Sequence, residues 1–181
     1  MNKKWIKINL VILQQLYLII EKYPLHSFLN PKILKEMEDI SFNMSYKSNV
    51  KAQMSDWYTT TPSLEVIKKL VCDILLKYEP GLSSHRLFFP DCWIARYNKG
   101  EFAQIHQHAL APYSFVYFVK CPKGSSPLVV GDRKKRIKAE EGKMVIFPGW
   151  LAHGVPPNKC DGRVVVAGNV AVDETERIKD M

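Results

Sequence analysis

Two histidines stand one residue apart in the segment YNKGEFAQIHQHALAPYSFVYFV, which spans residues 97–119. The β-branched and aromatic residues around them are typical of a buried strand. Because side chains alternate across a strand, His106 and His108 are expected on one face, together with Phe102 and Gln104. Two imidazoles that converge in this way are either core residues or metal ligands, and a third ligand is needed to define a metal site.

A third histidine lies in GKMVIFPGWLAHGVPPNKCDGRVVVAGNV, where Pro148 and Gly149 end a predicted strand and His153 follows. His153 comes 47 residues after His106, far enough for another part of the same barrel to return to the pair. Three histidines on one side of a divalent transition metal leave the other positions open for a substrate and dioxygen. The three residues together are therefore a candidate metal site, although His153 alone resembles an ordinary loop histidine.

An arginine begins the last apolar segment, RVVVAGNVAV, ten residues after His153. The strand is apolar on both faces except for Arg163 and Asn169, which share a face with Val165 and Ala167. Arg163 is therefore expected inside the barrel or at its mouth, where an unpaired charge costs several kcal/mol. A carboxylate is the natural partner, because the planar guanidinium binds it through two parallel hydrogen bonds.

The two halves of the chain differ in their hydrophobic pattern. Residues 1–84 carry apolar residues at helical spacing, most clearly in TPSLEVIKKLVCDILLKYEPG, where Thr61 can cap a helix and Pro62 suits its first turn. Residues 85–181 contain short β-branched and aromatic runs separated by Gly, Pro and Asn. Residues 41–60 show neither pattern and are predicted to form a surface loop. One compact domain is expected, with an N-terminal helical region supporting a β-sandwich or barrel.

The composition is that of a globular protein of 181 residues, with 46% hydrophobic, 11% aromatic and 24% charged residues. A net charge of +8 favours anionic ligands or surfaces without identifying one. The four cysteines form no C-x-x-C pair, which disfavours a zinc knuckle or a disulfide framework and fits a reducing, intracellular setting.

The N-terminal run KKWIKINLVILQQLYLII has the outline of a signal peptide, but two glutamines interrupt it and no small-residue cleavage site follows. The run is also too short and too polar to span a bilayer. No membrane partner is expected, and a cytoplasmic location is predicted.

A basic segment, GDRKKRIKAEEGK, occupies residues 131–143. It is predicted to be a hairpin with a solvated, charged tip. The alternative is that its cations guide an acidic protein or a nucleic acid toward the barrel mouth. No interleaved aromatic residues support a nucleic-acid groove.

The motifs together resemble the 2-oxoglutarate/Fe(II)-dependent dioxygenases, in particular the prolyl-4-hydroxylase-like branch. The matching pieces are H-x-H, then G-x-x-x-x-F-P-x-W-L-x-H-x-V-x-P, then an arginine ten residues after the histidine. The resemblance covers roughly residues 93–172 and implies a double-stranded β-helix, a jelly-roll or cupin-like barrel supported by a helical layer. It also implies Fe(II) held by His106, His108 and His153, with 2-oxoglutarate and dioxygen as cosubstrates.

The same resemblance implies that Arg163 pairs with the far carboxylate of 2-oxoglutarate and that Tyr97 bonds the cosubstrate or lines its pocket. Succinate would be the product from 2-oxoglutarate, and the prime substrate, a small molecule or a protein side chain, is not indicated. Two positions depart from the family pattern. His108 stands where the family usually has a carboxylate, although the bacterial and phage oxygenase branch that the chain most resembles also has H-x-H. Phe118 stands where many relatives have a tyrosine that helps to hold the cosubstrate. Ser114, four residues before Phe118 and on the same strand face, is a candidate to substitute in part for that tyrosine hydroxyl, and Asn169 is a further candidate contact to the cosubstrate.

Two other functions fit parts of the pattern. GEFAQIHQH also matches the opening motif of cupins, and three-histidine cupins use iron and dioxygen without 2-oxoglutarate. Trp150 stands where the second cupin motif has glycine, and no glutamate follows the first histidine pair at the expected place. Arg163, in the position that the dioxygenase family gives it, favours the reaction with 2-oxoglutarate. The second alternative is a barrel that keeps its ligands as relics and acts as a binding module, which three intact histidines and the arginine disfavour.

Overall fold

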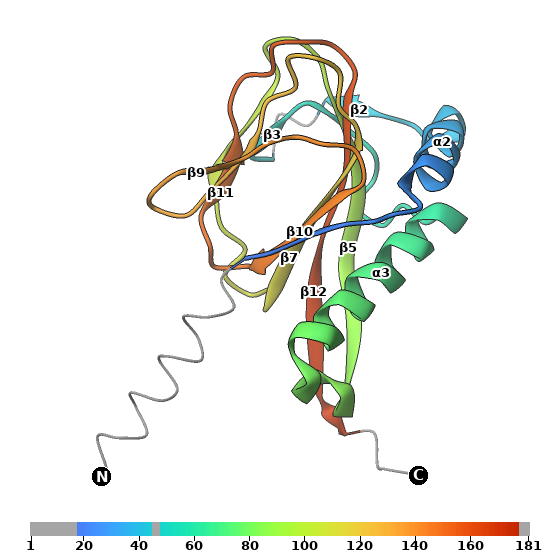
Figure 1. The fold of residues 1–181 in the computed structure, drawn as a ribbon, viewed down its shortest axis with the longest axis vertical. Coiled ribbons are helices and arrows are strands. Elements are labelled where there is room, and N and C mark those ends of the chain that lie inside the picture. The colour runs from blue at the N-terminus through green and yellow to red at the C-terminus, as the bar shows by residue number, and fades with distance from the viewer. Residues whose placement is uncertain (1–17, 45–47, 178–181) are drawn as a thin grey trace.

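Two antiparallel sheets face each other and enclose a barrel, with helices on the outer face of the larger sheet (Figure 1). This computed structural model describes residues 18–44 and 48–177. The larger sheet has the strand order β1-β10-β7-β12-β5-β4-β2, and the smaller has the order β3-β6-β11-β8-β9. The elements are β1 Ile19–Lys22, α2 His26–Glu36, η1 Met37–Asp39, β2 Asn43–Met44, β3 Val50–Lys51, β4 Gln53–Met54, α3 Pro62–Tyr78, η2 Pro80–Ser84, β5 His85–Tyr97, β6 Phe102–His106, β7 Tyr113–Lys120, β8 Leu128–Val130, β9 Lys135–Ile137, β10 Lys143–Pro148, β11 His153–Val155 and β12 Arg163–Arg177.

The larger sheet is buried on both faces, which explains the nearly continuous apolar runs in its strands. One face packs against the helices through residues such as Ile94, Tyr117 and Val166. The opposite face lines the barrel through residues such as Trp93 and Phe118. Two hydrophobic cores therefore share one sheet, and the mainly β fold with a helical layer agrees with the sequence prediction.

Helix α3 begins as predicted. The Thr61 hydroxyl accepts a hydrogen bond from the Leu64 amide at 3.3 Å, and Pro62 occupies the first turn. The buried face of the helix is formed by Leu64, Ile67, Val71 and Leu75.

Helix α2 is tied to the sheet by a buried side chain, Asn30. Its Nδ2 donates to the Val119 carbonyl at 2.6 Å, and the Tyr117 hydroxyl donates to its Oδ1 at 2.7 Å. Both polar groups of the Asn30 side chain, the NH2 and the carbonyl oxygen, thus have a hydrogen-bond partner, as a buried amide requires. The bonds fix the helix against β7, a strand that also lines the barrel.

The described part of residues 41–60, which leaves out 45–47, is not the surface loop that the sequence predicted. It contains β2, β3 and β4, and its side chains include the buried Val50, Ala52 and Met54. Strand β3 pairs with β6 in the smaller sheet, whereas β4 pairs with β5 in the larger sheet. The segment therefore crosses from one sheet to the other. Strands of two residues carry too few positions for an alternating pattern to be recognised.

The basic segment forms a hairpin, as predicted. Strand β8 pairs with β9 in antiparallel register, and residues 132–136 around the turn are exposed. Most of the N-terminal run considered as a signal peptide lies outside the described residues. Among the residues that are described, no helix is long and apolar enough to cross a membrane.

Candidate metal centre

Three histidines converge between the two sheets. One potential ligand nitrogen from each of His106, His108 and His153 lies within 4.8 Å of the other two. The ring centroid of His106 lies 4.9 Å from that of His108 and 4.3 Å from that of His153, and the centroids of His108 and His153 are 5.2 Å apart. His106 ends β6 and His153 begins β11, and the two residues are directly opposite each other in the register of these strands. The structure thus brings together all three histidines that the sequence singled out.

A β-bulge in β6 changes the neighbours that strand alternation had predicted. His153 is opposite His106 and Val155 is opposite Ala103, so three residue steps on β6 face two on β11. As a result Gln104 is exposed, and it does not share the inward face with His106. The prediction that Phe102 and Gln104 accompany the histidine pair was therefore wrong, although the convergence of the pair was right.

His108 is held by a loop after β6 and not by the strand itself. The His108 amide donates to the Gly149 carbonyl at 2.7 Å, and the Gly149 amide donates to the Pro112 carbonyl at 3.2 Å. A Cβ at Gly149 would lie 2.1 Å from the Ala111 carbonyl oxygen and 2.6 Å from that of His108. Glycine at this position is thus required by the close approach of the His108 loop.

Backbone carbonyls orient two of the rings. His106 Nδ1 lies 2.7 Å from the Gln104 carbonyl oxygen, and His153 Nδ1 lies 2.9 Å from that of Leu151. Because a carbonyl can only accept, each Nδ1 carries the proton and each Nε2 keeps its lone pair. This is the arrangement in which a second hydrogen bond presents the other ring nitrogen to a metal.

Burial keeps the rings in the neutral form that binds metal. It lowers the pKa of His106 and of His108, and it lowers the pKa of His153 to about 3. The neighbouring imidazoles lower the pKa of His153 further, since a second positive charge nearby is unfavourable. At neutral pH no proton has to leave these rings before they coordinate a cation.

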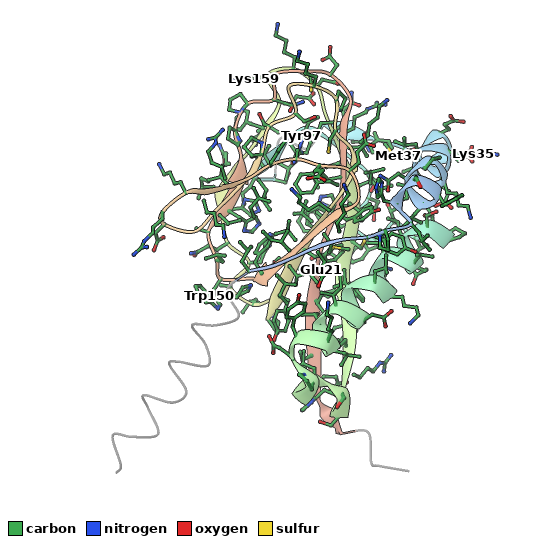
Figure 2. All side chains as sticks on the ribbon, viewed as in Figure 1. Glu21, Lys35, Met37, Tyr97, Trp150 and Lys159 are labelled. Atoms are coloured by element: carbon green, nitrogen blue, oxygen red, sulfur yellow. The ribbon has the colours of Figure 1, made fainter. Side chains whose placement is uncertain are left out.

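Arg163 is the largest fully buried side chain among the described residues, and none of its guanidinium nitrogens has a hydrogen-bond partner there. Its guanidinium carbon lies 4.7 Å from the ring centroid of Tyr97 and 5.4 Å from that of Phe118. Desolvation by burial lowers the pKa of Arg163, because it disfavours the charged form. The aromatic faces attract the cation, and the nearby Tyr97 side chain favours the charged guanidinium by raising its pKa. Figure 2 shows Tyr97 inside the barrel, and both Tyr97 and Arg163 line the cavity that contains the three histidines.

Ser114 and Asn169 lie at a different level of the barrel from Arg163. Arg163 is opposite Tyr97 in the register of β12 and β5, whereas Asn169, six residues further along β12, is opposite Ser114 of β7. The Ser114 hydroxyl donates to Asn169 Oδ1 at 2.6 Å. The structure therefore does not bring either residue to Arg163, so Ser114 cannot replace the hydroxyl that Phe118 lacks. Ser114 does line the histidine cavity.

Sequence reasoning missed Asp91 and Trp93, which lie on the inward face of β5 with Ala95 and Tyr97. Strand alternation counted back from Tyr97 places both on this face. Alternation along the strand that ends at Tyr97 is therefore the signal in the sequence that identifies them.

Comparison with known proteins supports the fold. No protein-family model and no curated protein matches the sequence. Among solved structures, the viral collagen prolyl hydroxylase of Paramecium Bursaria Chlorella virus-1, solved with 2-oxoglutarate, matches with a TM-score of 0.69 and 14% identity over 87% of this chain and 97% of its own. A prolyl-4-hydroxylase from Pseudomonas putida matches with a TM-score of 0.68 and 14% identity over 87% and 94% of the two chains.

A prolyl hydroxylase from Trichoplax adhaerens, solved with a peptide of hypoxia inducible factor, matches over 98% of this chain and 96% of its own, with a TM-score of 0.69 and 13% identity. The likeness thus extends over nearly the whole chain, beyond residues 93–172 that the motifs covered. The chain has the double-stranded β-helix fold of these neighbours, which confirms the fold that the motifs implied.

Substitution of Gly149 is expected to weaken metal binding. The added Cβ of Gly149→Ala would collide with the loop that carries His108, so Fe(II) affinity should fall roughly tenfold or more, as when a supporting group of a ligand is disturbed. Anaerobic metal titration measures the effect. Gly81→Ala is the matched control, because a Cβ there meets nothing within 4 Å. Equal metal affinity of the two variants would mean that the loop does not position His108.

The buried histidines are expected to make the metal-free fold sensitive to mild acid. A histidine with a lowered pKa stabilises the fold above its ordinary pKa, and this contribution is lost as the pH falls toward the folded value of about 3. The free energy of unfolding should therefore fall by about 2 kcal/mol more in the wild type than in His153→Gln between pH 7 and pH 5. Urea unfolding at the two pH values measures the difference. Identical pH dependence would show that His153 is not neutral and buried in solution.

Proposed function

We propose that the protein is an Fe(II)- and 2-oxoglutarate-dependent oxygenase that hydroxylates a C–H bond of a prime substrate. The observation that carries the proposal is the combination, in one cavity, of three converging histidines with the buried and unpaired Arg163. The fold supports the general class of oxidoreductase. The cofactors and the reaction are inferred from the side chains that this chain places inside the barrel.

The histidine cluster fits Fe(II). Neutral imidazole nitrogens suit this metal, and three ligands on one side leave the remaining positions for other groups. His106, His108 and His153 would hold the ion. A set of three neutral ligands leaves the full charge of the cation on the site, whereas the commoner set with a carboxylate reduces it by one unit. The site would therefore favour a dianionic cosubstrate and bind the bare metal less tightly.

Arg163 fits one end of 2-oxoglutarate. Its fork of N–H donors matches a carboxylate, and the absence of another acceptor among the described residues leaves all three nitrogens available. Tyr97 and Phe118 would form the walls on either side of this carboxylate. The 2-oxo acid end would then reach toward the histidines. The cosubstrate would thus span the cavity from Arg163 to the metal.

When bound, the iron and 2-oxoglutarate would supply the oxidation by dioxygen: one oxygen atom enters the hydroxyl group and the other enters succinate, with release of CO2. The chain's own residues bind, orient and exclude water. Arg163 fixes the cosubstrate, the carbonyls of Gln104 and Leu151 keep the proton on Nδ1 of two ligands, and the apolar walls keep the site dry.

A three-histidine cupin dioxygenase that does not use 2-oxoglutarate is the second candidate. The ligand set favours it, since among the described residues the cluster contains three histidines and no carboxylate. That reaction leaves the buried guanidinium without an anion, and we therefore place it second.

Turnover without a prime substrate tests the proposal. Fe(II)-loaded protein in air should slowly convert 2-oxoglutarate to succinate, measured by mass spectrometry, and His153→Ala should abolish the conversion. His85→Ala is the control, because His85 lies outside the cluster and bonds to Ser84. If the wild type makes no succinate while it binds iron, the cupin reaction becomes the better account.

Replacement of Arg163 is expected to separate stability from binding. Arg163→Met removes a buried charge without a partner, so the metal-free protein should gain about 1–4 kcal/mol in its free energy of unfolding. The same variant should lose 2-oxoglutarate affinity by roughly thirtyfold or more, with little change in iron affinity. Chemical denaturation and calorimetry measure the two effects.

Arg96→Met is the control for this prediction, because the Arg96 side chain is only partly buried and donates to Gln53. It should not stabilise the fold. Loss of stability in Arg163→Met, with unchanged 2-oxoglutarate binding, would make Arg163 a structural residue.

A further inference from the structure

The inward face of two paired strands carries charges of opposite sign at its two ends. Along β5 and β12 the opposing residues are Tyr97 and Arg163 at one end and Asp91 and Asn169 at the other. Six residues separate Arg163 from Asn169, which corresponds to about 20 Å along a strand. The cation at the first end serves 2-oxoglutarate in the proposed function. That function assigns no role to the carboxylate at the second end.

Asp91 is held in one orientation by hydrogen bonds from a single neighbour. The Asn169 amide donates to Asp91 Oδ1 at 2.8 Å, and Asn169 Nδ2 lies 3.0 Å from Oδ1 and 2.8 Å from Oδ2. Ser114 donates to Asn169 Oδ1 and thereby fixes which end of the amide faces the carboxylate. All of these donors are neutral. No ion pair of Asp91 is found in the part of the chain that the structure describes, so its negative charge is fixed but not neutralised.

An aromatic wall lies next to this carboxylate. Trp57 and Trp93 stack with ring centroids 6.0 Å apart and an interplanar angle of 30°. The Trp57 carbonyl accepts from the Cys92 amide at 2.8 Å, which holds the Trp57 segment beside β5. Trp93 is buried, but Trp57 is 48% exposed, so its ring is accessible to a ligand. The indole ring is the aromatic face that attracts cations most strongly.

The carboxylate and the two rings belong to the same groove as the metal ligands. This groove is lined by Trp57, Asp91, Trp93, Asn169 and two of the histidines, His106 and His108. A group bound between Asp91 and the indoles would therefore sit beside the candidate metal centre, on the side away from Arg163. This is the position that a prime substrate has to occupy.

We propose that this groove binds an organic cation, an ammonium or guanidinium group on an alkyl chain, as the recognised part of the prime substrate. The role of the cation as a prime substrate rests on the proposed function. The preference for a cation rests on Asp91 and the two indole rings alone. The carboxylate supplies the countercharge, the rings supply cation–π attraction, and the alkyl chain extends toward the histidines. The groove thus selects a cation although the whole chain has a net charge of +8.

Asp91 also has a structural role that the test must separate from binding. The pairing of β12 with β5 is irregular between Asn169 and Ala171, and Asp91 bonds to the Asn169 backbone at this point. Asp91→Asn keeps one side-chain oxygen that can accept from that amide and from Asn169 Nδ2, and it removes the charge together with the second acceptor. Trp57→Leu provides a second variant, because Trp57 is half-exposed and its loss leaves the core intact.

Calorimetric titration of ligands into the full-length chain tests the inference. The uncharged compound N-acetyl-norleucine amide is the reference ligand. N-acetyl-lysine amide and N-acetyl-arginine amide should bind at least roughly tenfold more tightly than this reference, the gain expected of a partly desolvated charge pair with an aromatic contact. Asp91→Asn should abolish the preference, and Trp57→Leu should reduce it. Asp161→Asn is the matched control: its carboxylate also accepts a backbone amide, from Lys99, but lies outside the groove. It should retain the preference.

Equal affinity for the charged and uncharged probes would overturn the inference, as would an undiminished preference in a folded Asp91→Asn or Trp57→Leu variant. n-Butylamine distinguishes the source of the cation. If n-butylamine binds as tightly as N-acetyl-lysine amide, the natural ligand is a free amine. If n-butylamine binds more weakly, the natural ligand is a side chain of a peptide. Both results support the cation site. The titrations are run without metal and 2-oxoglutarate, so failure here is distinguishable from failure of the oxygenase proposal.

Discussion

The buried charge of Arg163 is the constraint on which the account of this protein depends. A guanidinium that is fully buried and has no acceptor among the described residues is costly, and a fold keeps it only when another state of the molecule satisfies it. Aromatic faces from Tyr97 and Phe118 reduce the cost without supplying hydrogen bonds. In the proposed function an anion satisfies the guanidinium, and the three neutral imidazoles that line the same cavity hold a metal cation.

The rest of the fold holds these groups at fixed levels of one barrel. The register of β5 with β12 sets Arg163 opposite Tyr97 and Asn169 opposite Asp91, while the register of β6 with β11 sets His106 opposite His153. The helices cover the outer face of the larger sheet, so the inner face is free to form the cavity (Figure 1). The register of the strands therefore determines how far Arg163, Asp91 and the histidines are from one another along the barrel. The side chains at each position determine its charge.

Much of the site followed from residue type and spacing, but local irregularities did not. Arg163 was identifiable because a polar residue in an apolar strand needs a reason, whereas His153 was identifiable only as a third ligand for the pair of His106 and His108. The neighbours of His106 were predicted wrongly, because one bulge residue reverses the alternation on which the argument relied. The position of His108 depends on the contact of its loop with Gly149, which only the folded chain reveals. Strands β2, β3 and β4 were missed because two residues carry no periodicity.

The most direct measurement of the central claim is an anaerobic titration of the Fe(II)-loaded protein with 2-oxoglutarate, followed by visible absorption. Chelation of the metal by a 2-oxo acid produces a metal-to-ligand charge-transfer band. The account predicts that this band appears and saturates at one 2-oxoglutarate per iron, because Arg163 and the histidines bind opposite ends of the same molecule. Stoichiometric iron binding without any such band would contradict the account, since the buried guanidinium would then have no role in holding this cosubstrate.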